Sequence, residues 1–171
     1  MQPNRNIQTG DLLFFRPTGW VGRLICLVTR SEYCHVGLAC IEVDGDVSIR
    51  EYREFGYREM SLEEAEREWE DKADVWRNES SLSAEYATIF IRSCPKEYGW
   101  FHFLWIGFFM LCFRWLTKRL IFAECDQHAP TCSEAVCRAY RYSGRELVAG
   151  IPDRLTSPGD IIRGGKIIKV E

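Results

Sequence analysis

A β-hairpin is the clearest structural element that the sequence of this 171-residue chain predicts. The mostly apolar run of residues 34–43 (CHVGLACIEV) and the mixed run of residues 47–52 (VSIREY) flank the turn sequence DGD at residues 44–46. Gly and Asp at such a turn favour a tight reversal, so the two runs are expected to pair as antiparallel strands. With a three-residue turn, Val43 is expected to face Val47 across the hairpin.

Further strand and helix patterns lie on both sides of the hairpin. Additional strands are expected at residues 8–15, 74–77 and 87–91, and a closing hairpin at residues 160–162 and 166–170. Helices are expected at residues 19–30, 62–71, 96–120 and 132–143, with Ser61 and Thr131 as N-caps and Gly144 after the last helix. This mixture predicts an α+β fold, and the length suits a single domain over residues 1–171.

Composition and charge narrow the choice of partners and compartment. The chain has 22 basic and 25 acidic residues and a net charge of −3, which gives no electrostatic reason to expect a nucleic acid as partner. The first ten residues are polar and lack the apolar core of a secretory signal, so a cytoplasmic protein is expected. In that compartment the eight cysteines should be reduced, and most of them should be inert and buried.

The most apolar stretch is residues 100–113 (WFHFLWIGFFMLCF), within an apolar helix expected at residues 100–122. This stretch is shorter than the roughly 18 to 20 residues that a membrane-spanning helix needs. Two interpretations remain open. The helix is buried in the core, or it lies at a membrane interface with Arg114, Lys118 and Arg119 near the headgroups. A peripheral membrane contact through residues 100–113 is the second of these hypotheses.

Cys132 has the sequence context of an activated thiol. It follows the N-cap Thr131 and begins the expected helix CSEAVCRAY. A thiol at a helix N-terminus has a lowered pKa because the helix dipole stabilises the thiolate, which is the nucleophilic form. The backbone N–H of Cys132 is also free to donate, as first-turn amides are, and would provide half of an oxyanion hole. Cys137, five residues later, points elsewhere and is expected in the core.

A catalytic thiol needs a base, and the chain has three histidines. His35 lies at the start of a strand, and Gly37 two residues later leaves open space on the same face, where a helix could approach. His102 lies in the apolar helix, and His128 lies in a polar loop four residues before Cys132. The residues alone do not decide among the three.

Metal binding is the competing interpretation of the same region. Cys125, His128, Cys132 and Cys137 are soft ligands within 13 residues, and structural zinc sites use such ligands. Their spacing is irregular, whereas structural zinc sites usually show tight pairs such as C-x2-C. Cys137 would also have to turn from the helix toward the loop. Thiol chemistry without a metal or other cofactor is therefore the preferred interpretation.

Three separated blocks resemble the circularly permuted NlpC/P60 family of papain-like cysteine hydrolases, the YiiX/LRAT type. The block GDLLFFRPTGWVGRLICLVTRSEYCHVGL resembles the family's first strand, short helix and His-Val-Gly strand. TCSEAVCRAYRYSG resembles the block in which the catalytic Cys opens a helix, and SPGDII resembles the closing strand. The His block precedes the Cys block, as in the permuted order, and residues 60–125 are not matched in detail.

This resemblance implies a permuted papain-like fold, in which the Cys helix packs against a small antiparallel sheet or barrel that carries the His. It implies Cys132 as nucleophile, His35 as general base and acid, Glu51 as third member, and Tyr33 at the substrate or oxyanion site. In the expected register Glu51 lies opposite Ala39, four residues along the strand from His35. A bulge or strong twist must then close the gap, or another residue orients His35.

Three functions from different classes follow from these observations. The preferred one is a cysteine peptidase or amidase that forms a thioester acyl-enzyme on Cys132 and acts on peptides or cell-wall peptides. The second is a lipid-directed acyl hydrolase or acyltransferase at a membrane surface, which the aromatic residues of 100–113 suggest. The third is a non-catalytic binding module or a zinc protein.

Overall fold

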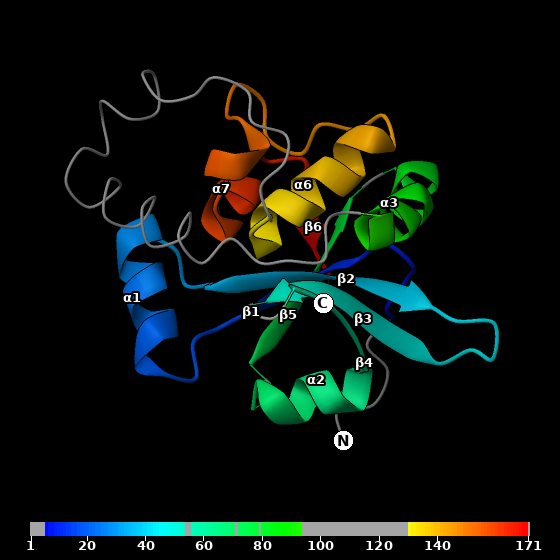
Figure 1. Cartoon of the computed structure of the whole chain (residues 1–171), viewed down its shortest axis with the longest axis horizontal. Coiled ribbons are helices and arrows are strands. Elements are labelled where there is room, and N and C mark those ends of the chain that lie inside the picture. The colour runs from blue at the N-terminus through cyan, green and yellow to red at the C-terminus, as the bar shows by residue number, and fades with distance from the viewer. Residues whose placement is uncertain (1–5, 54–55, 71, 79, 94–129, 171) are drawn as a thin grey trace.

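The structure is a computed structural model that describes residues 6–53, 56–70, 72–78, 80–93 and 130–170 (Figure 1). Its centre is a six-stranded antiparallel sheet in the order β4-β3-β2-β1-β5-β6. The strands are β1 (Leu12–Phe15), β2 (His35–Ile41), β3 (Val47–Arg53), β4 (Gly56–Ser61), β5 (Ala73–Asn78) and β6 (Ile167–Lys169). The helices are α1 (Trp20–Thr29), α2 (Leu62–Glu68), α3 (Ser81–Ser93), α6 (Cys132–Tyr142) and α7 (Pro158–Arg163), with a 3-10 turn η1 (Asp153–Leu155).

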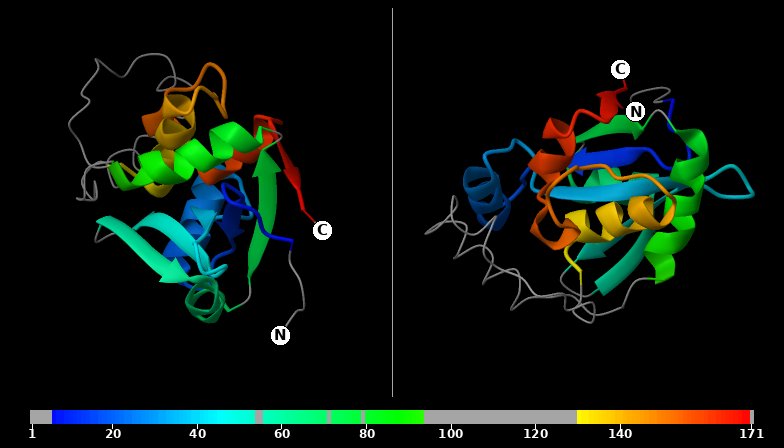
Figure 2. Two further views of the ribbon diagram at one scale, coloured as in Figure 1. Left: turned by 90° about the vertical axis from the view of Figure 1, so that its right-hand side faces the viewer. Right: turned by 90° about the horizontal axis from the view of Figure 1, so that it is seen from above.

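Helices cover both faces of the sheet. Figures 1 and 2 show α3, α6 and α7 over one face and α2 over the other. Side chains of a strand alternate between the two faces, and β1 accordingly sends Leu12 and Phe14 into the core that includes α3 and α6. Leu13 and Phe15 enter the second core, which includes residues of α2. Burial on both faces explains why β1 is apolar throughout, and the α+β class is confirmed at this level.

The hairpin of β2 and β3 is confirmed, but its register differs from the expected one. Ile41, and not Val43, faces Val47. The turn is wider than DGD, because the N–H of Glu42 donates to the carbonyl of Asp46 at 2.8 Å and closes a five-residue loop. The two extra residues shift every later pair of the hairpin by two positions and leave the faces of the strands unchanged.

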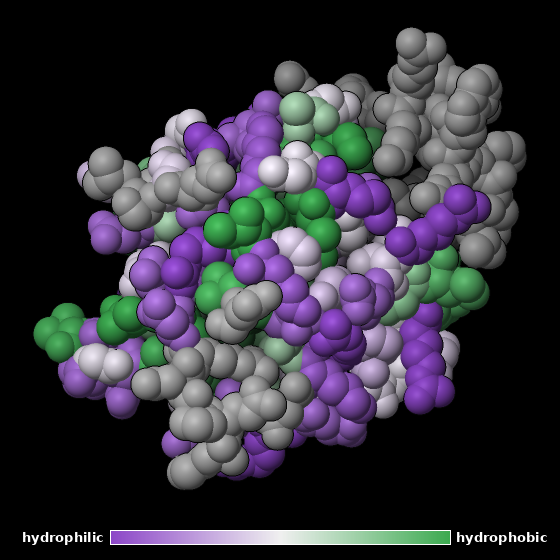
Figure 3. Space-filling model, turned by 180° about the vertical axis from the view of Figure 1, so that it is seen from behind, coloured by the Kyte–Doolittle hydropathy of each residue, from purple (hydrophilic) through white to green (hydrophobic). Residues whose placement is uncertain are grey.

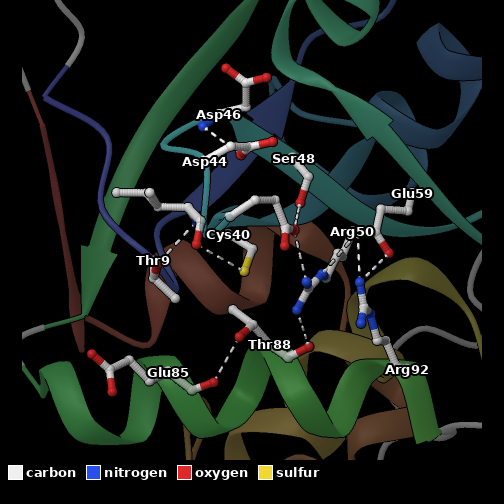
Figure 4. A network of polar contacts seen from close by, with 12 residues as sticks. Thr9, Cys40, Asp44, Asp46, Ser48, Arg50, Glu59, Glu85, Thr88 and Arg92 are labelled. Atoms are coloured by element: carbon white, nitrogen blue, oxygen red, sulfur yellow. Dashed lines mark hydrogen bonds and ion pairs between the residues drawn. The ribbon is translucent and has the colours of Figure 1, made fainter.

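A buried arginine fastens this hairpin to the helical layer. Arg50 lies on β3 opposite Leu38 and is 4% exposed. Its guanidinium donates to the backbone carbonyl of Thr88 in α3 at 2.9 Å, as Figure 4 shows, and to the carboxylate of Glu42 at 2.9 Å. These contacts tie β3 to α3 and to the end of the hairpin loop.

Two stretches expected to be strands are helical. Residues 87–91 belong to α3, and residues 160–162 belong to α7. The motif SPGDII begins a helix because the Ser157 hydroxyl accepts from the N–H of Asp160, and Pro158 occupies the first turn, where a missing N–H is harmless. The closing hairpin is therefore wrong, and β6 pairs with β5 instead.

One strand was missing from the expected elements. Gly56 begins β4, which pairs with β3 along its length. Its φ of 93° lies in the region that favours glycine, so the chain reverses there. The helix after β4 begins as expected, because the Ser61 side chain accepts from the N–H of Glu64.

The expected helices at residues 96–120 and 100–122 lie outside the described residues, as does the stretch 100–113. Among the helices that the structure does describe, none combines the length and the hydropathy needed to cross a membrane.

Candidate active site

The first turn of α6 holds Cys132 in a fixed position. Thr131 caps the helix as predicted: its side chain accepts from the N–H of Glu134, and the Glu134 carboxylate accepts from the N–H of Thr131. This reciprocal cap orders the helix N-terminus. Cys132 is 8% exposed and is the first residue of the helix, where the helix dipole favours a thiolate.

The side chain of Cys132 lies next to that of His35, the first residue of β2, and the two groups shift each other's pKa. Burial alone would raise the pKa of Cys132, but the charge of His35 and donors that include the N–H groups of Val36 and Ser133 hold it below the ordinary thiol value. Burial alone would lower the pKa of His35, but Cys132 and Glu51 outweigh burial and raise that pKa to about 10. The pKa shifts of Cys132 and His35 thus favour the charged form of each group, and each charge contributes to the shift of the other.

Glu51 holds the other side of the imidazole. Its Oε2 lies 2.8 Å from Nε2 of His35, and its side chain is fully buried. Burial would raise the pKa of Glu51, but the charge and hydrogen bond of His35 lower it overall. Since Glu51 occupies Nε2, Nδ1 is the ring nitrogen that remains for the sulfur of Cys132.

The register of the hairpin explains how Glu51 reaches His35 without a bulge. Leu38 faces Arg50, so Glu51 lies opposite Gly37, two residues from His35 and on the same face. A Cβ on Gly37 would lie 3.4 Å from the Cβ of Glu51 and 3.0 Å from Cγ2 of Ile49. Gly37 thus leaves room for side chains of the neighbouring strand β3. The sequence had suggested that it leaves room for a helix.

Trp69, which the sequence analysis did not single out, lies flat against the imidazole. It follows α2 and is 8% exposed. The ring centroids of Trp69 and His35 are 5.1 Å apart, with 11° between their planes. Phe15 stacks on Trp69 at 4.8 Å, and the guanidinium of Arg53 lies 5.2 Å from the Trp69 ring centroid. The only signal in the sequence that could have pointed to Trp69 is its position, as an aromatic residue at the end of a heavily charged helix.

Tyr33 has contacts other than those implied by the resemblance. Its hydroxyl donates to Asp74 of β5 at 2.6 Å, and its ring lies 5.5 Å from that of Phe14. The guanidinium of Arg16 lies 5.0 Å from the Tyr33 ring centroid. With its hydroxyl bound to Asp74 and its side chain buried, Tyr33 links β1, β2 and β5, and these contacts give no support to an oxyanion role.

Among the five cysteines that the structure describes, Cys132 differs electrostatically from the others. The pKa values of the other four are all raised, with burial as the largest cause: Cys26, Cys34, Cys40 and Cys137. Cys137 is buried in the core under α6, as predicted. The described thiol with the strongest thiolate character is therefore the one next to a histidine.

The fold is similar to that of the metalloprotein YiiX from Escherichia coli O157:H7 (DUF1105). The two superpose with a TM-score of 0.62 over 96% of this chain and 96% of that chain, and 19% of the residues are identical. No protein-family model and no curated protein matches the sequence. At this level of identity the comparison shows a shared fold, and the chemistry must be argued from the residues of this chain.

The described residues do not fit a metal centre. Within these ranges no group of three or more His, Cys, Asp or Glu side chains is arranged to hold an ion. The site residues contact one another in series, from Cys132 to His35 to Glu51, and do not converge on a common point. Cys125 and His128, two members of the candidate zinc set, lie outside the described residues.

Proposed function

We propose that this chain is a cysteine hydrolase of amide or similar acyl bonds, with Cys132 as nucleophile, His35 as acid and base, and Glu51 as the residue that orients His35. One observation carries the proposal. A buried thiol with a lowered pKa, at a helix N-terminus, contacts an imidazole that a buried carboxylate holds from the other side.

The proposed reaction uses these three side chains and one backbone amide. The Cys132 thiolate attacks the substrate carbonyl carbon, and the N–H of Cys132 stabilises the negative oxygen that forms. The carbon–nitrogen bond then breaks, His35 gives its proton to the leaving amine, and a thioester remains. His35 next removes a proton from water, and the resulting hydroxide displaces the Cys132 thiolate, which releases the acid. With an acceptor other than water, the same site would act as a transferase.

The permuted papain-like arrangement belongs to this proposal. The chain order supports it, because the imidazole lies on an early strand and the thiol on a late helix. The fold shared with YiiX adds support at the level of architecture. The substrate classes that follow are peptides, cell-wall peptides or acyl lipids, and a cytoplasmic location stays a prediction.

Alkylation with iodoacetamide, followed by peptide mapping, tests the proposed nucleophile. Cys132 is expected to react first among the eight cysteines, and His35→Ala is expected to slow its alkylation by at least tenfold, because the free thiol is then mostly protonated at neutral pH. Cys40→Ala, which removes a thiol of raised pKa on β2, is the control and should leave that rate unchanged. Equal labelling of all eight thiols would contradict the proposal.

A lipid-directed acyl hydrolase is the second candidate. The exposed apolar side chains of α1 favour this candidate, because α1 is followed directly along the chain by the segment that carries His35. Fatty-acid release from phospholipid vesicles that disappears in Cys132→Ala, with no cleavage of peptide amides, would select this candidate. Cleavage of peptide amides alone would select the first. The contact proposed for residues 100–113 is a separate hypothesis, which Ser substitutions at Trp100, Phe101 and Trp105 would test in liposome binding.

A further inference from the structure

α1 carries an exposed apolar strip. None of its residues is buried, although most are apolar. Trp20, Leu24 and Leu27 are 77%, 49% and 72% exposed, and they lie along one face because the helix repeats every 3.6 residues. In Figure 3 hydrophobic residues gather at the right-hand edge of the molecule, where α1 lies. Scattered exposed apolar residues are ordinary, but a continuous strip on one helix indicates an interaction surface.

The opposite face holds α1 against the fold. A Cβ on Gly22 would lie 3.1 Å from the sulfur of Cys34, so helix and strand segment are in close contact there. At the C-terminal end, the guanidinium of Arg163 in α7 donates to the backbone carbonyls of Thr29 and Arg30. The helix that carries the strip is therefore anchored to the fold. Its Gly22 lies against Cys34, the residue before His35.

The charges around the strip are positive, in contrast with the net charge of −3 for the chain. Between Leu12 and Ser31 the sequence contains three arginines and no acidic residue. Arg23 and Arg30 are exposed; Arg23 lies within α1 next to Leu24, and Arg30 is the C-cap residue at the end of the helix. In the ranges that the structure describes, neither side chain forms an ion pair, whereas Arg16 is bound to Glu32.

We propose that α1 docks this protein on an anionic lipid surface. Trp20, Leu24 and Leu27 enter the boundary between headgroups and acyl chains, and Arg23 and Arg30 contact headgroup phosphates. An amphipathic helix with Trp and Leu on one side and arginines beside them is the element that binds in this way. The docking needs no catalysis and thus goes beyond the proposed hydrolase, and it places the Cys132–His35 site beside the lipid.

Co-sedimentation with vesicles of phosphatidylcholine, with and without phosphatidylglycerol, tests this surface. The wild-type chain is expected to sediment with the anionic vesicles and to dissociate as salt rises. The double variant W20S/L27S should weaken the partition coefficient at least about tenfold, because two large apolar side chains no longer enter the lipid. R23Q/R30Q should weaken binding to the anionic vesicles by roughly fivefold per arginine and change binding to the neutral ones little.

Two controls separate this surface from the rest of the molecule. Y86S/I89S removes two apolar side chains of α3 that are 54% and 59% exposed, and it should bind as the wild type does. Cys132→Ser should also bind normally, so failure of the proposed chemistry and failure of docking remain distinct.

Four outcomes would overturn the proposal. The first is that the wild type binds neither vesicle, and the second is that W20S/L27S and Y86S/I89S lose vesicle binding equally. The third is that W20S/L27S has a lowered unfolding temperature whereas Y86S/I89S does not. The fourth is that the wild type is a dimer and W20S/L27S is a monomer. The third would show that another part of this chain covers the strip, and the fourth that a second copy does.

Discussion

At the residue scale, the electrostatics of the candidate site centre on one imidazole. His35 receives three different contacts: the thiol of Cys132, the carboxylate of Glu51, and the flat face of Trp69. Cys132 and Glu51 favour the protonated ring and outweigh the effect of burial on its pKa, and a stacked aromatic ring such as Trp69 is also a favourable neighbour for a cation. The catalytic roles of these residues stay predictions, and the contacts define how to test them.

Replacement of Trp69 tests whether it positions and stabilises the imidazolium. Trp69→Leu keeps an apolar side chain but removes the ring that stacks on His35, so alkylation of Cys132 at neutral pH is expected to slow roughly fivefold. Trp69→Phe should restore most of the rate. Trp76→Leu is the matched control, because Trp76 packs on Phe14 and has no ring contact with His35. If W69L and W69F lose stability without any change in the alkylation rate, Trp69 is only a packing residue.

The raised pKa of His35 predicts a pH dependence of stability and of reactivity. A group whose pKa rises on folding stabilises the folded state fully below its unfolded value near 6.5, and this contribution is lost as pH rises through about 10. A reaction that needs the imidazolium proton should fall over the same upper range. In Cys132→Ala the ring loses a charge partner, so NMR titration should find the pKa of His35 lower than in the wild type. An unchanged value would contradict the ion pair.

At the element scale, α6 is the feature that local sequence signals described best. The Thr131 cap, Cys132 at the first helical position and Gly144 after the helix were all predicted, because capping acts between residues three or four apart. The same kind of signal in SPGDII was interpreted as a strand, although Ser157 and Asp160 form an equivalent cap. The capping box formed by Ser157 and Asp160 is the local interaction that makes this segment helical.

Removal of the α6 cap should affect stability and reactivity together. Thr131→Ala leaves first-turn N–H groups without their acceptor and should lower the free energy of unfolding by about 1 kcal/mol. It should also slow alkylation of Cys132, because the helix end that stabilises the thiolate frays. Ser61→Ala removes the cap of α2, which holds no site thiol. Chemical denaturation should find a similar loss in the free energy of unfolding for both variants. Slower alkylation of Cys132 in S61A would show that the effect of Thr131→Ala is not specific to the α6 cap.

At the scale of the whole molecule, the candidate site is an interface between two layers. Cys132 belongs to the helical layer, and His35 and Glu51 belong to the sheet. One contact between the layers is at Gly10, whose carbonyl accepts from the Tyr140 hydroxyl of α6 at 2.6 Å. Any change that moves the layers apart should separate the thiol from the imidazole, even when it is far from both along the chain.

Gly10 offers a direct test of this coupling. Its φ is +86°, and a Cβ there would lie 2.2 Å from the Cβ of Ala84, so Gly10→Ala combines backbone strain with a clash against α3. We expect a cost of about 3 kcal/mol or more in chemical denaturation, with slower alkylation of Cys132. Gly45→Ala has a φ of +91° but open space, and should cost about 1 kcal/mol without affecting Cys132. Equal costs would show that the clash is relieved easily.

The sequence alone determined the features that act between neighbouring residues: the hairpin, α1, the cap of α6, and the identities of Cys132 and His35 as candidates. Only the tertiary structure decided the features that depend on long-range packing. These are the register that brings Glu51 to His35, the helical state of residues 87–91, and the stacking of Trp69 on the imidazole. The physical reason is that capping and periodicity act over three or four residues. A hairpin register or a ring stack is instead selected by burial among segments that are distant in the chain.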